Sequence, residues 1–301
     1  MRPKSAHRHR MENSMKLCRF DDNRLGVVRG EQVLDVTEAM DALPALRYPY
    51  PIADQLIANL AMLKPRIESL CGTAKHHALA EVQLLAPVAN PGKIIGAPVN
   101  YVKHLQEVLN DVSLHHNNQI NQIERAGLFL KANSSLVGPA HGVQLNMPDR
   151  RTDHEIELVA VIGKRAKNVP AEGALSYVAG YCIGLDITIR GPEERSLRKS
   201  PDSYTVLGPW LTTADEVAAP GNLEMELLIN GATRQKTNTV GLILGVEALI
   251  AFASRFYTLE PGDLIFTGTP EGVSQIQAGD RFKASIEQVG QMDVTIHPAA
   301  R

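Results

Sequence analysis

Short, mainly apolar runs alternate with polar turns in the N-terminal part of the chain. Three such runs, separated by turns rich in Asp, Asn and Gly, predict a small antiparallel meander: residues 15–20, 25–28 and 33–36. Apolar residues then recur at helical spacing over 52–70, where we expect Pro65 to end or kink the helix. The Pro- and Ala-rich segment 85–92 is the best candidate for a linker.

Beyond residue 93 the pattern changes to many short strands and few helices. Seven apolar runs, cut by Gly and Pro, predict strands: 93–97, 129–131, 155–162, 178–190, 223–229, 263–267 and 281–286. The segments 101–125 and 239–256 have helical spacing, and the second predicts one long helix. Because strands and helices do not alternate strictly, we expect an α+β fold dominated by mixed sheet.

These changes divide the 301-residue chain into three parts. Residues 1–14 are basic and lack an apolar run, which excludes a secretory signal, and we expect a poorly ordered leader. A small β-rich N-terminal domain is predicted for 15–86, and a larger domain for 93–298.

Composition excludes several classes of partner. Lys and Arg number 31 against 33 Asp and Glu, so the net charge of −2 offers no basic excess for nucleic acid. The longest apolar stretch contains Glu247 and Arg255 and is too polar to span a membrane. The three cysteines, Cys18, Cys71 and Cys182, are far apart and form no CxxC pair, which favours a reducing cytoplasm.

Three acidic residues in predicted strands are the first candidates for chemistry. Side chains alternate along a strand, so Glu155 and Glu157 project from one face while Ile156 projects from the other. A solvated charged edge would explain this pair alone. Asp186 lies inside a second apolar strand, where a carboxylate is costly unless it is paired or metal-bound. Together the three carboxylates favour an oxygen-ligand site for a hard cation such as Mg²⁺.

Two further features involve His104 and Lys199. His104 and Glu107 are three residues apart, which makes them neighbours on one helical face. A carboxylate beside an imidazole fixes its tautomer and suits it to activate water, although exposed pairs of this kind are common. Lys199 is either a surface charge or a cation that stabilises a developing enolate.

An ordered set of motifs over residues 93–294 resembles the fumarylacetoacetate hydrolase family. The segments that carry the resemblance include Asn100-Tyr101-xx-His104-xx-Glu107, Phe129-Leu130-Lys131-Ala132-Asn133-Ser134-Ser135, Asp153-His154-Glu155-Ile156-Glu157, Asp186-Ile187-Thr188-Ile189-Arg190, Lys199-Ser200-Pro201-Asp202, Gly208-Pro209-Trp210 and Thr267-Gly268-Thr269-Pro270-Glu271-Gly272-Val273. Each motif is weak alone, whereas the ordered set is specific. The resemblance implies a catalytic domain with a mixed β-roll or β-sandwich core, and a homodimer.

The resemblance also implies a role for individual positions. The residues that match the family's metal ligands, for Mg²⁺ or Mn²⁺, are Glu155, Glu157 and Asp186. Those that match its catalytic lysine and its water-handling dyad on a short lid helix are Lys199, His104 and Glu107. Those that match contacts to the substrate's carboxylate end are Arg190 and Thr269.

The chain departs from the family pattern after Arg190. Gly191 and Glu193 stand where the family often has Asp and Gln. The position implies that Glu193 lies in the substrate site, where its charge would repel a carboxylate unless Arg195 or Arg198 offsets it.

Together these observations predict a cytoplasmic, Mg²⁺-dependent hydrolase acting on carbon–carbon bonds in ketonic substances. We expect a small 2,4-dioxo acid as substrate, of the acylpyruvate or fumarylpyruvate type, in the catabolism of aromatic compounds or organic acids. Decarboxylation of an oxaloacetate-like acid, or isomerisation or hydration of a dienoate, would use the same metal site. A non-catalytic metal- or ligand-binding protein is a third alternative, and Glu193 is its only support.

Overall fold

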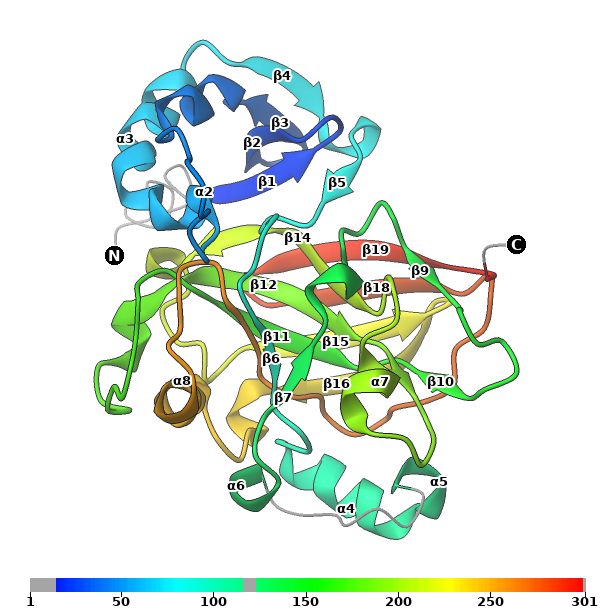
Figure 1. The fold of residues 1–301 in the computed structure, drawn as a ribbon. Helices are drawn as coiled ribbons and strands as arrows, with labels where there is room; N and C mark the ends of the chain where they lie inside the picture. Colours follow the sequence, from blue (N-terminus) through cyan, green and yellow to red (C-terminus); the bar gives the residue numbers. More distant parts are fainter. Residues whose placement is uncertain (1–14, 116–122, 300–301) are drawn as a thin grey trace, which may run out of the picture.

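A computed structural model describes residues 15–115 and 123–299 (Figure 1). The predicted leader, 1–14, lies outside the described residues. The described chain forms three sheets with short helices around them, which confirms the predicted α+β class. No helix within the described residues is long and apolar enough to cross a membrane.

The largest sheet has twelve strands within the described residues. Its order is β4-β3-β2-β1-β14-β12-β11-β17-β6-β7, with β5 paired to β1 and β8 to β14. The strands are β1 Lys16–Phe20, β2 Arg24–Arg29, β3 Gln32–Asp35, β4 Lys75–Ala78, β5 Leu84–Leu85, β6 Ile94–Gly96, β7 Phe129–Lys131, β8 Leu136–Val137, β11 Ile156–Ile162, β12 Val178–Asp186, β14 Thr205–Thr213 and β17 Leu264–Phe266.

Two smaller sheets and short helices complete the described fold. The five-stranded sheet contains, in order, β16 Ala232–Asn238, β15 Glu224–Ile229, β18 Arg281–Ile286, β19 Gly290–His297 and β9 Val143–Gln144, and the two-stranded sheet pairs β10 Thr152–Asp153 with β13 Thr188–Ile189. The helices are α2 Gln55–Ala58, α3 Leu60–Leu70, α4 Val102–Asn110, α5 Val112–His115, α6 Ile123–Ala126, α7 Arg195–Lys199 and α8 Val246–Phe256.

Strand β11 is continuously apolar because both of its faces are buried. Leu158 and Ala160 pack in one hydrophobic cluster with residues of β15, β18 and β19. Val159 and Val161 face a second cluster, which includes Leu63 of α3. A strand between two cores needs apolar residues at every position, so a charged residue at its start is conspicuous.

The N-terminal strands join the sheet of the larger part of the chain. The meander forms close to the predicted bounds, and β1 pairs antiparallel with β14, so the sheet continues across the predicted linker. The helix predicted for 52–70 is broken at Asn59, between α2 and α3, and α3 runs through Pro65. Leu63 and Ile67 are fully buried on either side of this exposed proline, and their packing offsets the lost backbone hydrogen bond.

The helix predicted for 239–256 begins later than expected. A 3-10 turn occupies Thr239–Gly241, and α8 starts only at Val246, after Gly245. The buried side chain of Asn100 donates to the carbonyl of Leu244 and accepts from its N–H, both in place of helical hydrogen bonds. This tertiary contact overrides the local helical spacing.

Strand β14 was not predicted because it contains a Gly-Pro pair. The register of β12 with β14 shifts there, so that Ile183 pairs with Gly208 and Tyr181 with Thr212. Pro209 lies in the resulting irregularity, where its missing N–H costs no regular ladder bond. Strands β16 and β19 were also missed.

Candidate active site

Three buried carboxylates meet where β11 and β12 lie side by side. Glu155 immediately precedes β11, Glu157 belongs to it, and Asp186 ends β12. The N–H of Asp186 donates to the carbonyl of Glu155 at 2.9 Å, which fixes the ends of the two strands against each other. One oxygen atom from each carboxylate lies within 4.8 Å of the other two. The predicted alternation holds, since Ile156 points into the core.

Lys199, at the C-terminal end of α7, lies against two of these carboxylates. Its Nζ donates to Glu155 Oε2 at 2.8 Å, to Asp186 Oδ2 at 2.5 Å and to Thr188 Oγ1 at 2.7 Å. An ammonium has three donors, so all three are used within the protein. In this arrangement Lys199 acts on its surroundings through its charge.

Lys131 is a second buried lysine that the sequence reasoning assigned no role. It lies in β7, and its Nζ donates to Asp186 Oδ1 and, at 2.8 Å, to the carbonyl of Tyr204. Burial lowers the pKa of Lys131, and the charge of Asp186 opposes that effect. In the sequence, the one sign of a role for Lys131 is that it lies inside a short strand that carries a family motif. Its contact with Asp186 arises only from the pairing of the strands.

Arg190 holds Glu155 from another side. Its Nε donates to Asp153 Oδ2 at 2.8 Å, and a terminal nitrogen donates to Glu155 Oε1 at 2.9 Å. Glu155 therefore accepts from both Arg190 and Lys199. The predicted contact of Arg190 with substrate stays a prediction; two of its five N–H donors serve these two carboxylates.

Glu155 and Glu157 differ in electrostatic environment although they are two residues apart. Burial opposes the ionisation of Glu155, but the charges of Lys199 and Arg190 outweigh it and hold the pKa of that carboxyl well below its usual range. Burial raises the pKa of Glu157 well above its usual range, and the charges of Asp186 and Glu155 raise it further. Among the described residues, no cation forms an ion pair with Glu157.

The donor set fits a divalent metal ion. Glu157 accepts only from the backbone N–H of Gly268, at 2.6 Å, among the described residues. A cation between the three carboxylates would supply the positive charge that Glu157 lacks. The donors are all carboxylate oxygens, which suit Mg²⁺ or Mn²⁺.

The predicted dyad forms on α4. His104 Nδ1 lies 2.7 Å from Glu107 Oε2, and His104 is buried. A carboxylate partner makes Nδ1 the protonated nitrogen, which leaves Nε2 free to accept a proton. The other carboxylate oxygen of Glu107 accepts from the N–H of Gly272 at 2.9 Å.

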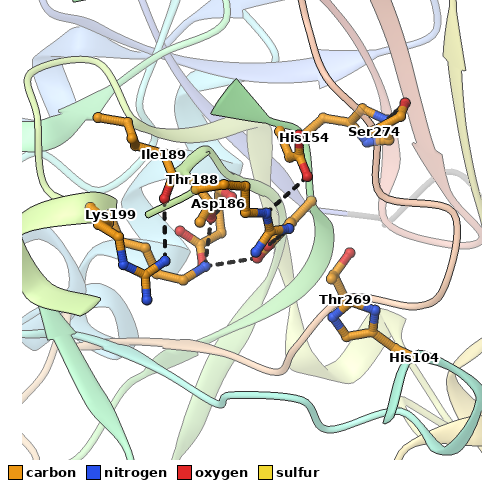
Figure 2. A network of polar contacts seen from close by, with 12 residues as sticks. His104, His154, Asp186, Thr188, Ile189, Lys199, Thr269 and Ser274 are labelled. Atoms are coloured by element: carbon orange, nitrogen blue, oxygen red, sulfur yellow. Dashed lines mark hydrogen bonds and ion pairs between the residues drawn. The ribbon is translucent and has the colours of Figure 1, made fainter. Parts of the chain in front are cut away.

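One loop connects the dyad to the carboxylates. Gly268 N–H binds Glu157, and Gly272 N–H binds Glu107, so residues 268–272 link both groups. Gly272 has a φ of 93°, and a side chain there would meet the carbonyl oxygen of Arg234 at 2.2 Å. Figure 2 shows His104 beside Thr269 of this loop, facing the side on which Asp186 and Lys199 lie.

Thr269 and His154 are held by one buried amide, Gln235. Its Nε2 donates to Thr269 Oγ1 at 2.9 Å, and its Oε1 lies 3.0 Å from His154 Nδ1. His154 Nε2 lies 2.8 Å from Ser274 Oγ, so both ring nitrogens have protein partners. His154 therefore turns away from the carboxylates, as the alternation of the strand predicts. Sequence reasoning missed Gln235, which comes from β16.

Glu193 forms an ion pair that the sequence did not reveal. Arg150 donates to both carboxylate oxygens, each at 2.9 Å, and lowers the pKa of Glu193 to about 2. Arg195 or Arg198 was expected to offset this charge, but the carboxylate pairs with Arg150, and Arg198 donates to the Glu193 carbonyl. The negative charge of Glu193 is therefore balanced by Arg150.

The sequence of residues 93–297 matches the family model described as fumarylacetoacetate (FAA) hydrolase C-terminal. The chain belongs to the fumarylacetoacetate hydrolase family. This confirms the resemblance drawn from the motifs, and the match covers the carboxylates, both lysines and the dyad.

Relatives in this family include enzymes of known activity. A maleylpyruvate hydrolase of Aquipseudomonas alcaligenes is 59% identical over 284 residues, covering 94% of this chain and 99% of that protein. A crystal structure of maleylpyruvate hydrolase from Sphingobium sp. SYK-6, in complex with manganese(II) ion and pyruvate, has 41% identity and a TM-score of 0.81, and covers 95% of this chain and 100% of that chain. A mitochondrial oxaloacetate tautomerase of Rattus norvegicus is 36% identical over 70% of this chain and 68% of its own.

Proposed function

We propose that this protein hydrolyses maleylpyruvate or a closely similar acylpyruvate to pyruvate and a carboxylic acid. The observation that carries the proposal is a triad of buried carboxylates joined by one loop to a His–Glu dyad. The predicted enzyme class, a hydrolase acting on carbon–carbon bonds in ketonic substances, is confirmed by similarity to maleylpyruvate hydrolases along nearly the whole chain. The non-catalytic alternative loses its support, because Arg150 neutralises Glu193.

We infer that the 2-oxo acid end of the substrate binds at the three carboxylates. Glu155, Glu157 and Asp186 would hold a divalent cation, whose positive charge would polarise the oxygens of a 2-oxo acid. We infer that Mg²⁺ is the metal used in the cell and that Mn²⁺ can replace it. Lys199 and Lys131 each form an ion pair with Asp186 and hold its carboxylate in place.

The dyad supplies the base for water. His104 Nε2 accepts a proton from water, while Glu107 holds Nδ1 and stabilises the imidazolium that forms. The hydroxyl oxygen bonds to C4 of the dioxo acid, the C3–C4 bond breaks, and the electron pair remains on C3. One proton must then reach C3 to give pyruvate, and protonated His104 can return the proton that it took from water.

We infer a cytoplasmic homodimer in the catabolism of aromatic compounds or organic acids. The three cysteines are free and buried, which agrees with a reducing compartment.

Tautomerisation or decarboxylation of oxaloacetate is the second candidate, favoured by the similarity to the oxaloacetate tautomerase. These reactions need no attacking water. His104→Ala should therefore reduce them less than it reduces hydrolysis.

The test measures products from maleylpyruvate, acetylpyruvate and oxaloacetate with Mg²⁺, with Mn²⁺ and with EDTA. We expect metal-dependent release of pyruvate with one equivalent of maleate or acetate, and no turnover in EDTA. Metal-dependent change of oxaloacetate alone would replace the hydrolase proposal with the second candidate.

A further inference from the structure

Arg195, the first residue of α7, differs from the other arginines around the site. Its half-buried guanidinium forms no hydrogen bond and no ion pair with any described residue, and its Cζ lies 5.6 Å from the centroid of the Phe129 ring. Four other arginines around this site each donate to a carboxylate or to a backbone carbonyl: Arg150, Arg151, Arg190 and Arg198. A guanidinium that is partly removed from water and faces no protein acceptor is suited to bind an anion.

Arg195 lies one helical turn from Lys199. Residues four apart occupy the same face of a helix, about 6 Å apart along its axis. Lys199 Nζ also rests on the Phe129 ring, 5.1 Å from its centroid, so both cations share one aromatic residue. Burial lowers the pKa of Arg195, while the charges of Glu155 and Asp186 raise it, which places these carboxylates within electrostatic reach.

We propose that Arg195 binds the distal carboxylate of the acyl group and so selects substrates whose acyl group ends in a second carboxylate. This inference rests on the proposed function. With the 2-oxo acid end at the carboxylate triad, C4 and the acyl group extend away from it. The distal carboxylate of maleylpyruvate is three carbons beyond C4, and Arg195 lies one helical turn from Lys199, which contacts the triad. The planar guanidinium can bind it through two parallel hydrogen bonds.

The neighbouring cations are less suited to this role. Arg198 already donates to the carbonyls of Ile189 and Glu193. Arg150 is occupied by Glu193. Arg195 is thus the arginine of this group that can bind a carboxylate without giving up a hydrogen bond to a described residue.

The test compares maleylpyruvate with acetylpyruvate, which lacks the distal carboxylate, in wild type, Arg195→Gln and Arg195→Lys. Arg165→Gln is the matched control, because it removes the same charge from a side chain that is 75% exposed. For Arg195→Gln we expect KM for maleylpyruvate to rise about ten- to hundredfold, the value of one charge-assisted interaction. KM and kcat for acetylpyruvate should stay within about twofold. Arg195→Lys keeps the charge but loses the fork, and should give a smaller, equally selective loss.

Product inhibition provides an independent readout. The inhibition constant of maleate should rise in Arg195→Gln, whereas that of pyruvate should not change. Equal losses on both substrates, or an unchanged KM for maleylpyruvate, would overturn the inference while leaving the hydrolase proposal intact. Wild-type protein that hydrolyses neither substrate would overturn the proposed function and this inference with it. If Arg195→Gln fails to fold, judged by its circular dichroism, the same comparison in Arg195→Lys decides.

Discussion

The two halves of the site are built on different supports. The carboxylates and both lysines come from β7, β12, α7, β11 and the residue just before β11, and all five side chains are buried. The dyad comes from α4, a helix of nine residues at the end of the molecule opposite the N-terminal strands (Figure 1). Glu107 remains 26% exposed, and Val102 and Leu109 of the same helix are exposed apolar residues.

This difference indicates a fixed charged centre and a more adjustable base. Strand pairing on both sides of β11 sets the positions of Glu155 and Glu157. The polar ties of α4 to the rest of the described protein are few: Gly272 N–H to Glu107, and an exposed pair of Lys103 with Glu271 at 3.5 Å. Changes in the centre should therefore affect metal binding and folding, whereas changes in the dyad should affect turnover alone.

Asp186→Asn should have the largest effect. The variant removes one proposed metal ligand and the carboxylate that pairs with Lys131 and Lys199, so Mn²⁺ binding should be lost. Turnover should fall by about a thousandfold or more, since the charge lost is worth several kcal/mol. Isothermal titration with Mn²⁺ and a product assay measure both quantities. Asp215→Asn, at an exposed pair with Lys64, is the control, and normal Mn²⁺ affinity in Asp186→Asn would contradict the assigned metal site.

His104→Ala separates the two halves most directly. Loss of a general base costs about a hundred- to ten-thousandfold in kcat for hydrolysis. Mn²⁺ affinity should stay within about twofold, because His104 contacts no proposed metal ligand through a hydrogen bond. A variant that loses metal binding together with turnover would show that the dyad and the carboxylates form one inseparable unit.

Lys131→Met tests the lysine that sequence reasoning did not assign. Removing one partner of a buried ion pair costs about 3–5 kcal/mol in the free energy of unfolding. Lys64→Met, at the exposed pair with Asp215, should cost less than about 1 kcal/mol. Urea unfolding of both variants measures the difference. Equal costs would mean that Lys131 contributes no more than a surface charge.

Glu193→Gln should have the smallest effect, and that effect depends on pH. The folded-state pKa of about 2 lies below the usual value of 4.5, so the pair with Arg150 stabilises the fold above pH 4.5. This contribution is lost as the pH falls from 4.5 toward 2. The Tm of Glu193→Gln should lie slightly below that of wild type at pH 7, and the gap should narrow below pH 4.5 and close at about pH 2. Glu194→Gln is the matched control, because it removes the same charge from the neighbouring exposed residue, which forms no ion pair with any described residue.

Much of the site follows from local spacing. The alternation of a strand puts Glu155 and Glu157 on one face, and the period of a helix makes neighbours of His104 and Glu107. An aspartate within an apolar strand signals a buried partner. Each of these inferences needs only the geometry of one element, and the structure brings the residues together accordingly.

The tertiary structure alone decided which side chains from different elements pair with one another. Strand register and the packing of α7 over β7 decide three such cases. Lys131 pairs with Asp186, and Arg150 pairs with Glu193. Arg195 has no acceptor among the described residues. The helix at 239–256 starts late for the same reason, since Asn100 supplies the competing hydrogen bonds. Local periodicity sets the direction in which a side chain points from its own element, whereas its ion-pair partner depends on contacts between residues that are distant in sequence.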